Sequence, residues 1–385
     1  MQKVVQKRMS TTHKTKILHI LWTGRSGGME KFVRDVTFYS DQEHFKHYVC
    51  FLAQAGRFGE EIKKNGCEVY CLNMKNGLSV FSALQLLKVI REVGPDIINN
   101  HQRNILANII IMMFRKIQKI YFEHGGHLMG HSSFATKLFY DLFAIHYQVV
   151  MTNSKHVRDR IKKFKRMENK DVLSFYCGIH LDLYERKMAK LNIKEELGIP
   201  QENKVIGIVG RLVEQKGMDD FLRVASEVNK LNKACSFVVV GDGPLRQSLE
   251  QLASQLNLKI LFLGDRSDVP QFMGVFDIFI ITSKWEPFGI VVLEAMAARV
   301  PVVGFSVEGM KEIFETGGGI LIQKRNHREL AEVIVEVLNN DVKREQLIKE
   351  GYELVKNKFD FKNRIKCLEE IYRQLSVQKY ENSAR

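Results

Sequence analysis

The segment SKWEPFGIVVLEAMAARVPVV, residues Ser283–Val303, indicates the fold of this chain more directly than any other stretch. It follows the apolar run Ile278–Thr282, which predicts a buried strand. A turn containing Pro287 and Gly289 then opens an apolar helix. The segment therefore predicts a strand, a tight turn and a helix in direct succession.

Two carboxylates mark this segment, because Glu286 lies in the turn and Glu294 lies within the helix. Carboxylates accept hydrogen bonds from ligand hydroxyls, and free amides at a helix N-terminus bind phosphate. The pattern favours a ligand that carries both groups. A solvated helix start is the simpler interpretation, since acids there favour the helix dipole, and the spacing by itself leaves both open.

The same alternation of β-rich runs and amphipathic segments extends along the whole chain. The predicted strands form two series, 17–22, 48–53, 68–72, 96–100, 119–123, 148–153 and 173–177, then 205–209, 236–240, 260–263, 278–282, 302–305 and 320–322. Strands that alternate with helices predict parallel sheets with helices on both faces. We therefore expect an α/β protein with two doubly wound, Rossmann-like domains and a ligand cleft between them.

Changes in composition predict the domain boundaries. A basic extension covers 1–15, a first domain 16–181, a polar linker 182–203 and a second domain 204–360. Residues 361–376 have the apolar spacing of an amphipathic helix, and the polar tail 377–385 is expected to fray.

The net charge of +14 is placed unevenly along the chain. Residues 1–180 contain 28 Lys and Arg against 14 Asp and Glu, whereas residues 181–385 contain 30 of each kind. The run 155–170 is the most basic, and its apolar residues recur at helical spacing. It predicts either a surface helix that touches anionic lipid or a solvated basic face. Zinc-finger and RNP-type motifs are missing from the sequence, so we expect no nucleic-acid partner.

The sequence predicts a cytoplasmic protein. If the protein touches a membrane, the contact is expected at the inner face of that membrane. Its longest uncharged apolar run, Ile105–Phe114, is too short to span a bilayer. The N-terminal residues lack the apolar region of a secretory signal. The six cysteines show no CxxC spacing, which is typical of reduced thiols.

The stretch GRLVEQKG, Gly210–Gly217, follows a predicted strand and carries two cations, Arg211 and Lys216. Cations beside glycines suit a diphosphate, although the GK[ST] ending of a Walker A loop is absent. The later stretch SFVVVGDGPLR indicates a tight strand-to-helix turn, because the third glycine of a dinucleotide fingerprint is missing. Asp265 ends the next strand, where its loop is expected to face a base or ribose.

In order and spacing these motifs resemble the family 4 retaining glycosyltransferases, a group with the GT-B fold. The resemblance is specific in the second half, where it rests on Gly210–Gly217, Gly241–Pro244, Gly264 and Glu286–Glu294. In the first half it is looser and rests on Gly27–Glu30, the run PDIINNH ending at His101, and His124–Gly125. It implies that the second domain binds a nucleotide sugar, that the first shapes the acceptor site, and that the C-terminal helix returns to the first domain.

The resemblance implies catalytic roles for four residues. Arg211 and Lys216 would hold the diphosphate and stabilise the leaving group, Glu286 would contact donor-sugar hydroxyls, and His124 would lie beside the sugar at the reaction centre. It also implies that Glu294 holds the ribose, that the amides of Phe288 and Gly289 bind the distal phosphate, and that glycines allow close approach of the backbone, namely Gly27, Gly28, Gly210 and Gly241.

The chemistry of sugar transfer agrees with these roles. A departing diphosphate gains negative charge, which two fixed cations and a helix N-terminus can stabilise. The sequence has no DxD-type acid pair at a strand end, so we expect transfer without a metal or cofactor; the nucleotide sugar is the substrate. Retention of configuration follows from the resemblance alone.

A competing interpretation treats His124, His127 and His131 as zinc ligands. An HExxH acid is missing and two glycines interrupt any helix, so histidines of a loop or core are the commoner case. His101 is likewise as well explained by packing at a strand end as by activity.

Three positions depart from the family pattern. Arg299 stands where relatives usually have glycine, Glu308–Gly309 replaces a Gly-Gly pair, and Cys177–His180 replaces an Asn-Gly-Val-Asp turn. None removes an expected phosphate ligand, but the first two leave the identity of the sugar open.

The sequence thus predicts a retaining enzyme that moves a hexose-type sugar from a nucleotide diphosphate donor, expected to be UDP-linked, to an envelope glycan or lipid-linked acceptor. An epimerase or glucan synthase of the same fold is the alternative among enzymes. A sugar-nucleotide-binding protein without turnover, or a basic nucleic-acid binder, is the alternative of another class.

Overall fold

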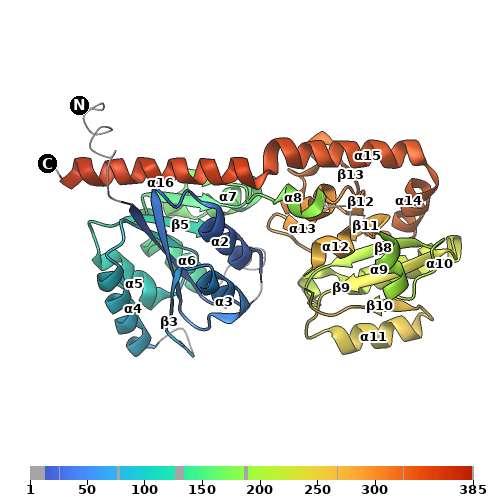
Figure 1. Cartoon of the computed structure of the whole chain (residues 1–385), viewed down its shortest axis with the longest axis horizontal. Helices are drawn as coiled ribbons and strands as arrows, with labels where there is room; N and C mark the ends of the chain where they lie inside the picture. Colours follow the sequence, from blue (N-terminus) through green and yellow to red (C-terminus); the bar gives the residue numbers. More distant parts are fainter. Residues whose placement is uncertain are drawn as a thin grey trace. The chain divides into compact units, whose positions relative to one another are not determined.

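The computed structural model describes residues 14–25, 27–75, 79–125, 134–185, 190–266, 268–323 and 325–383. These residues form two compact units, each with its own parallel sheet (Figure 1). The first unit holds the described residues up to Cys177 together with those from Lys362 onward, and the second runs from Gly178 to Phe361.

The first unit is built on a seven-stranded sheet with the order β3-β2-β1-β4-β5-β6-β7. Its strands are β1 (Thr15–Leu21), β2 (Phe45–Phe51), β3 (Glu68–Cys71), β4 (Ile97–Asn100), β5 (Gln118–Glu123), β6 (Val149–Thr152) and β7 (Val172–Ser174). Its helices include α2 (Gly28–Tyr39), α3 (Gly56–Lys64), α4 (Val80–Val93), α5 (Ile105–Met113), α6 (Phe134–Leu142) and α7 (Lys155–Ile161).

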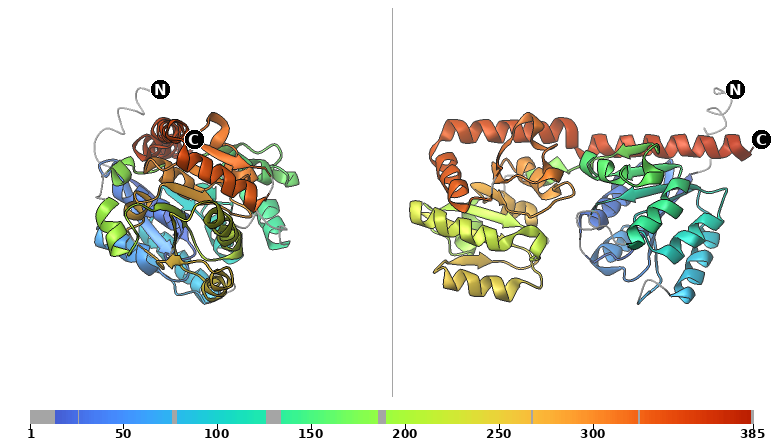
Figure 2. Two further views of the ribbon diagram at one scale, coloured as in Figure 1. Left: turned by 90° about the vertical axis from the view of Figure 1, so that its right-hand side faces the viewer. Right: turned by 180° about the vertical axis from the view of Figure 1, so that it is seen from behind.

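Alternation along the strands decides which helices cover each face of this sheet. Leu18 and Ile20 of β1 pack in one core cluster with the buried residues of α4 and α5. On the other face α2 contributes Phe32, which meets the ring of Phe122 edge-on at 5.4 Å. Figure 2 shows helices on both sides of the sheet.

The C-terminal helix α16 (Phe361–Ser383) packs on the first unit, and the figures show it running along that unit (Figures 1 and 2). The amide of Asn99 donates to the hydroxyl of Tyr372 (3.0 Å), and Arg364 donates to the carbonyl of Tyr176 (3.0 Å). The backbone amide of Asp41 donates to the Glu369 carboxylate (2.7 Å). The helix continues to Ser383, through much of the segment expected to fray.

The second unit is built on a six-stranded sheet with the order β10-β9-β8-β11-β12-β13. Its strands are β8 (Lys204–Val209), β9 (Cys235–Val240), β10 (Ile260–Phe262), β11 (Ile278–Ile281), β12 (Val302–Phe305) and β13 (Gly319–Ile322). Its helices include α8 (Leu181–Glu185), α9 (Lys190–Glu196), α10 (Met218–Leu231), α11 (Arg246–Gln255), α12 (Val269–Met273), α13 (Ile290–Ala297), α14 (His327–Asn339) and α15 (Asp341–Leu354).

The expected fold class is confirmed, because both units are parallel sheets of the Rossmann type, and each predicted strand lies within a few residues of an observed one. The segment 182–203, expected as a linker, contains most of α8 and all of α9 and groups with the second unit. In both sheets the strand order reverses, between β1 and β4 and between β8 and β11. Ligands of such sheets bind at the carboxyl ends of the strands at this switch point.

The departure at Arg299 has a structural explanation within the second unit. Its backbone is left-handed (φ 58°), a conformation that favours glycine. Its guanidinium lies 3.7 Å from the centre of the Tyr352 ring, and this cation–π contact offsets part of the backbone strain. The residue therefore contributes to packing against α15.

Candidate functional site

The loops that follow β8, β9 and β10 pack backbone against backbone. The amide of Gly210 donates to the carbonyl of Val240 (2.9 Å), and the amide of Gly241 donates to that of Gly264 (2.7 Å). A Cβ on Gly241 would lie 2.1 Å from the carbonyl oxygen of Gly210, and the φ of Gly241 is 132°. Only glycine accepts both this φ angle and this close approach. The contacts bring the three loops that are expected to bind the donor together at the carboxyl ends of the strands.

Lys216 and Glu286 meet at the switch point of the second sheet. Lys216 ends the 3-10 turn η3 (Glu214–Lys216) after β8, and Glu286 lies in the turn after β11. The Lys216 amine lies 2.5 Å from the Glu286 carboxylate, which also accepts from the Ser283 hydroxyl at 2.7 Å. Their side chains are 21% and 4% exposed, so the lysine is the more accessible partner.

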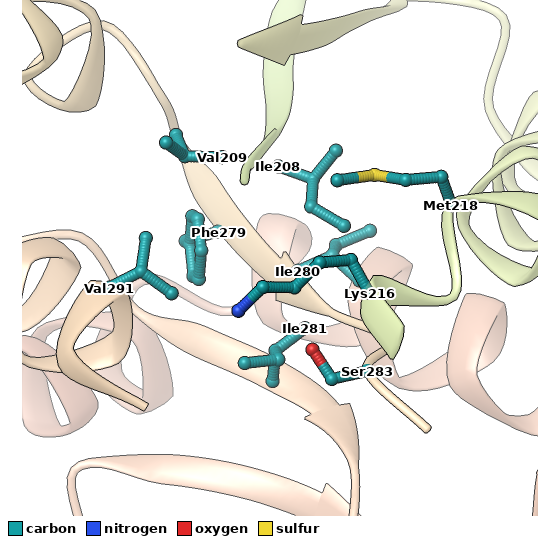
Figure 3. A pocket seen from close by; sticks show the side chains of 9 residues that line it. All are labelled: Ile208, Val209, Lys216, Met218, Phe279, Ile280, Ile281, Ser283 and Val291. Carbon is teal, nitrogen blue, oxygen red and sulfur yellow. The ribbon is translucent and has the colours of Figure 1, made fainter. Parts of the chain in front are cut away.

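A narrow hollow beside this pair, with no room for a water molecule, is lined mainly by apolar residues of β8, β11 and α13, including Ile208, Phe279 and Val291. Figure 3 shows the Lys216 side chain reaching across it, with Ser283 close by. The apolar lining packs against the stem of the Lys216 side chain and leaves the amine as its polar end.

Backbone contacts fix the position of Lys216 relative to β11. The amide of Lys284 donates to the carbonyl of Gln215 (2.7 Å), and the Thr282 hydroxyl donates to the carbonyl of Lys216 (3.3 Å). Gly217 is left-handed (φ 59°), and a Cβ there would lie 2.1 Å from the carbonyl oxygen of Thr282. The loop after β8 therefore lies directly against the end of β11.

Arg211 and Asp265 are both exposed at the ends of their strands. Among the residues that the structure describes, the Arg211 guanidinium has no ion-pair or hydrogen-bond partner. A charged group with no protein partner at a strand end is available to a ligand. The structure thus places Arg211 on the same loop as Lys216 but, unlike Lys216, does not pair it with an acid.

In the turn before α13 the backbone amides, rather than the side chains, are available to a ligand. Gly289 caps the helix in a left-handed conformation (φ 96°). The Phe288 ring is buried and packs 5.7 Å from Phe359, so this residue presents only its amide. Glu294 is 8% exposed one turn into the helix.

A Cβ on Gly309 would lie 1.7 Å from the carbonyl oxygen of Glu286, which explains why glycine is kept in Glu308–Gly309.

Three residues that sequence reasoning missed hold the end of β11. Arg325 donates to the carbonyls of Thr282 (2.6 Å) and Ser283 (3.1 Å) and forms an ion pair with Asp220. His327 contacts the same carboxylate at 2.7 Å. Burial alone would raise the pKa of Asp220, but hydrogen bonds from His327 and Arg325 outweigh it and hold this pKa below its usual value. In the sequence Asp220 looks like an ordinary acid of a helix's first turn.

In the first unit Gly27 and Gly28 open α2 after β1. Gly27 caps the helix, and its carbonyl accepts from the amide of Lys31 (3.1 Å). A Cβ on Gly27 would lie 2.3 Å from the Glu30 carboxylate, so a larger residue would disturb this turn. Both glycines are exposed, which leaves their amides open to a ligand.

His124 directly follows β5 and is partly exposed. Its Nε2 lies 3.1 Å from Nδ1 of His101, and its ring stacks on Phe122. Burial lowers the pKa of His124 to about 4 in spite of the Glu123 charge, so the ring is neutral at pH 7. The proposed zinc partners His127 and His131 lie outside the described residues.

The described residues contain one cluster of side chains close enough to share a metal ion, made up of Asp41, Glu43 and His44. Two of the three are exposed, and Asp41 accepts hydrogen bonds from both of the others. An Asx-type turn accounts for this arrangement without a metal.

Comparison with protein families matches both halves of the chain. Residues 189–354 match the model described as Glycosyl transferases group 1, and residues 26–183 match Glycosyltransferase Family 4. The two matches correspond to the second and first units. They include the expected donor loops and the expected first-domain positions Gly27 and His124.

Individual relatives extend this comparison. An uncharacterised glycosyltransferase of Methanocaldococcus jannaschii is 31% identical over 58% of this chain and 59% of its own length. The UDP-Gal:alpha-D-GlcNAc-diphosphoundecaprenol alpha-1,3-galactosyltransferase of Escherichia coli is 25% identical over 80% of this chain and 83% of its own. The chain spans only 47% to 61% of the length of five such relatives.

Solved structures share the whole fold. Anabaena HepE in complex with UDP and glucose superposes with a TM-score of 0.80 at 22% identity, covering 93% of this chain and 99% of its own. WaaG, a glycosyltransferase involved in lipopolysaccharide biosynthesis, gives a TM-score of 0.73 at 17% identity, over 92% and 99%. By these matches the chain belongs to the family 4, group 1 glycosyltransferases and has their GT-B fold.

Proposed function

We propose that this protein transfers a hexose-type sugar from a UDP-linked donor to a glycan or lipid-linked acceptor, with retention of configuration and without a metal. The observation that carries the proposal is the Lys216–Glu286 pair at the switch point of the second sheet, on the same loop as Arg211, which has no acidic partner among the described residues. Strand-end cations and a hydroxyl-accepting carboxylate together match the two ends of a sugar diphosphate.

The paired state of Lys216 suits this role. Glu286 holds the amine in one place, so an arriving diphosphate meets a cation that is already positioned. The Ser283 hydroxyl keeps a hydrogen bond to Glu286 when Lys216 turns toward phosphate. Glu286 then has oxygen lone pairs to accept from sugar hydroxyls, and Arg211 supplies a second positive charge.

The bound ligands and the names of similar proteins support the finer parts of the proposal. HepE binds UDP with glucose, and the Escherichia coli relative is named for UDP-Gal and a diphosphoundecaprenol acceptor. A Staphylococcus aureus relative is named as a poly(ribitol-phosphate) N-acetylglucosaminyltransferase. These names favour sugar transfer over the epimerase and nucleic-acid-binding alternatives, and their acceptors favour a lipid-linked or envelope acceptor over the glucan of a glucan synthase. Measured sugar transfer would distinguish the proposed enzyme from a sugar-nucleotide-binding protein without catalysis.

A thermal-shift screen tests the donor assignment. UDP and UDP-sugars are expected to raise the melting temperature, because a ligand that binds only the folded state stabilises it. Adenine and guanine nucleotides serve as controls for the base, and the Glu294→Ala variant should lose most of the shift if Glu294 holds the ribose. The same shift is expected in EDTA and in Mg²⁺. A shift that appears only in Mg²⁺ would contradict metal-free binding. The absence of a shift with every uridine nucleotide would contradict the UDP-linked donor.

The structure changes where a membrane contact is expected. The apolar residues of the basic run 155–170 do not face outward, because Val157 and Ile161 are fully buried and Phe164 packs against the same core cluster. The helix itself ends at Ile161. This segment therefore offers only its basic face, and its apolar residues are not available for a contact with lipid. None of the helices in the described ranges is both long and apolar enough to cross a membrane.

Large apolar side chains are exposed instead on the helices α4 and α5. Phe81 is 71% exposed and Leu84 57%, and on α5 Met113 is 59% exposed. The exposed Arg115 and Lys116 follow α5 directly. Apolar side chains beside cations favour the surface of an anionic bilayer. We therefore propose that a membrane contact, if a lipid-linked acceptor is used, lies at α4 and α5.

The double variant Phe81→Ser with Leu84→Ser is expected to release the protein from vesicles of anionic lipid, because it removes the most exposed apolar groups of this surface. Sedimentation with phosphatidylglycerol vesicles measures the effect. Charge reversal of Lys162, Lys163 and Lys165 is the matched comparison and is expected to weaken binding less. Undiminished binding by the serine variant would contradict a contact through α4.

A further inference from the structure

Four histidines of the first unit form one line across its sheet. His47 lies on β2, His19 on β1, His101 directly after β4 and His124 directly after β5. These strands are neighbours in the sheet in that order. The line ends at the hydroxyl of Ser40, the buried residue that follows α2.

The strand register explains why the rings meet. Ile17 of β1 pairs with His47, so His19 lies two residues further along the sheet than His47. The same step of two residues recurs from β1 to β4 and from β4 to β5. Because side chains alternate between faces with a period of two, steps of two keep all four histidines on one face. The line therefore rises toward the carboxyl ends of the strands and finishes at His124.

Each contact joins Nδ1 of one ring to Nε2 of the next. The distances are 3.0 Å from His47 to His19, 3.4 Å from His19 to His101 and 3.1 Å from His101 to His124. The ring centres are 5.2, 5.7 and 5.4 Å apart, with planes inclined by 28°, 19° and 30°. The nitrogens thus lie between the ring centres, and the rings meet end to end, as hydrogen bonds in the ring plane require.

All four rings are neutral at pH 7. Burial lowers the pKa of His47 to about 3 and that of His124 to about 4. It lowers the pKa of His19 and His101 well below the usual value, with a smaller contribution from the neighbouring rings. A neutral imidazole has one N–H donor and one acceptor nitrogen. A head-to-tail line then has two consistent states, with the proton on Nδ1 of every ring or on Nε2 of every ring.

Ser40 selects between these states. Its hydroxyl lies 2.5 Å from Nε2 of His47, which is its hydrogen-bond partner among the described residues. If every ring carried its proton on Nε2, the Ser40 hydroxyl proton would be buried without an acceptor, which is unfavourable. With the proton on every Nδ1, Ser40 donates to His47 and each ring donates to the next. His124 then presents an N–H at the end of the line.

We propose that Ser40, His47, His19 and His101 are positioning residues that hold His124 as its neutral Nδ1–H tautomer, so that it donates a hydrogen bond at the carboxyl end of β5 and does not act as a base. What His124 donates to rests on the proposed function, in which it is a hydroxyl oxygen of the transferred sugar. The tautomer itself is a property of the first unit and does not depend on that function.

Nitrogen NMR of the ligand-free, ¹⁵N-labelled full chain tests the tautomer directly. Long-range ¹H–¹⁵N spectra distinguish a protonated ring nitrogen from a bare one. All four histidines of the line are expected to show a protonated Nδ1 and a bare Nε2 at pH 7, with the exposed His146 as the reference for a ring open to water. A protonated Nε2 on His124, or a mixture of tautomers there, would overturn the proposal without the use of any variant.

Two substitutions of Ser40, at the end of the line opposite His124, test its role. Ser40→Ala removes the donor and is expected to give His124 a mixture of tautomers, whereas Ser40→Thr keeps the hydroxyl and the single tautomer. In a transfer assay Ser40→Ala should lower kcat by about 10-fold with a smaller change in KM, since a hydrogen bond to the reacting sugar is weakened. A single Nδ1–H tautomer that survives in folded Ser40→Ala would contradict the proposed role. Failure of the wild type to transfer sugar would instead count against the proposed function alone.

Discussion

Replacing Lys216 with methionine is expected to lower kcat for sugar transfer by about 100- to 1000-fold, the usual effect of removing one group that stabilises developing charge. The lysine is held at the switch point by Glu286 and by the contacts of its loop with β11. Methionine keeps the length of the side chain and its apolar packing in the hollow but removes the charge. Steady-state kinetics with the donor found in the thermal-shift screen measure the effect.

A matched control for this prediction is Lys284→Met. Lys284 is one-third exposed, and its nearest acids, Glu214 and Asp219, lie 3.6 and 4.0 Å away. Exposed pairs of this kind contribute little, so the control is expected to keep nearly full activity. Thermal melts of both variants separate loss of catalysis from loss of fold. A folded Lys216→Met variant with less than about a threefold fall in kcat would remove Lys216 from the phosphate assignment.

Replacing Gly309 with alanine is expected to destabilise the second unit by about 3 kcal/mol or more, because the new methyl group has no space. Its Cβ would lie 1.7 Å from the carbonyl oxygen of Glu286 and 3.0 Å from the carbonyl carbon of Pro287. Both neighbours are backbone of the turn that carries Glu286, so they cannot move aside as a flexible side chain would. Activity should therefore fall together with stability.

Gly274→Ala is the control for this second prediction. Gly274 has ordinary αR dihedral angles (φ −62°), and the nearest atom to an added Cβ is 3.4 Å away. The free energy of unfolding is expected to change by about 0.5 kcal/mol or less. Urea unfolding followed by fluorescence compares the two variants. Equal unfolding midpoints would show that the turn at Glu286 has more room than the structure indicates.

Much of the proposed donor site could be predicted because its signals are local. Gly210, Gly241 and Gly289 mark strand-end turns that need special backbone angles or close backbone approach, and such turns are visible in a single stretch of sequence. The alternation of strands and helices similarly predicts parallel sheets before any tertiary contact is known. The expected family was confirmed because these local signals occur in a fixed order.

Other features could not be predicted because they depend on residues far apart in the chain. Asp220 and Arg325 are separated by 105 positions and meet only at the end of β11. The apolar side of the run 155–170 looks like a lipid-binding face until its residues are seen in the core cluster with α6. Spacing along a helix reveals an apolar side but does not say what covers it.

The sequence by itself determined the fold class, the family and the strand-end residues from which the donor site is proposed, since period, turn chemistry and charge are properties of short segments. Only the tertiary structure decided which strand ends are neighbours. His19 lies 28 positions from His47 and 82 positions from His101 along the chain. In the sequence these three histidines therefore look like separate core residues. They become one hydrogen-bonded line because the sheet order places β2, β1, β4 and β5 side by side, and hydrogen bonds act only over the few ångströms that this order creates.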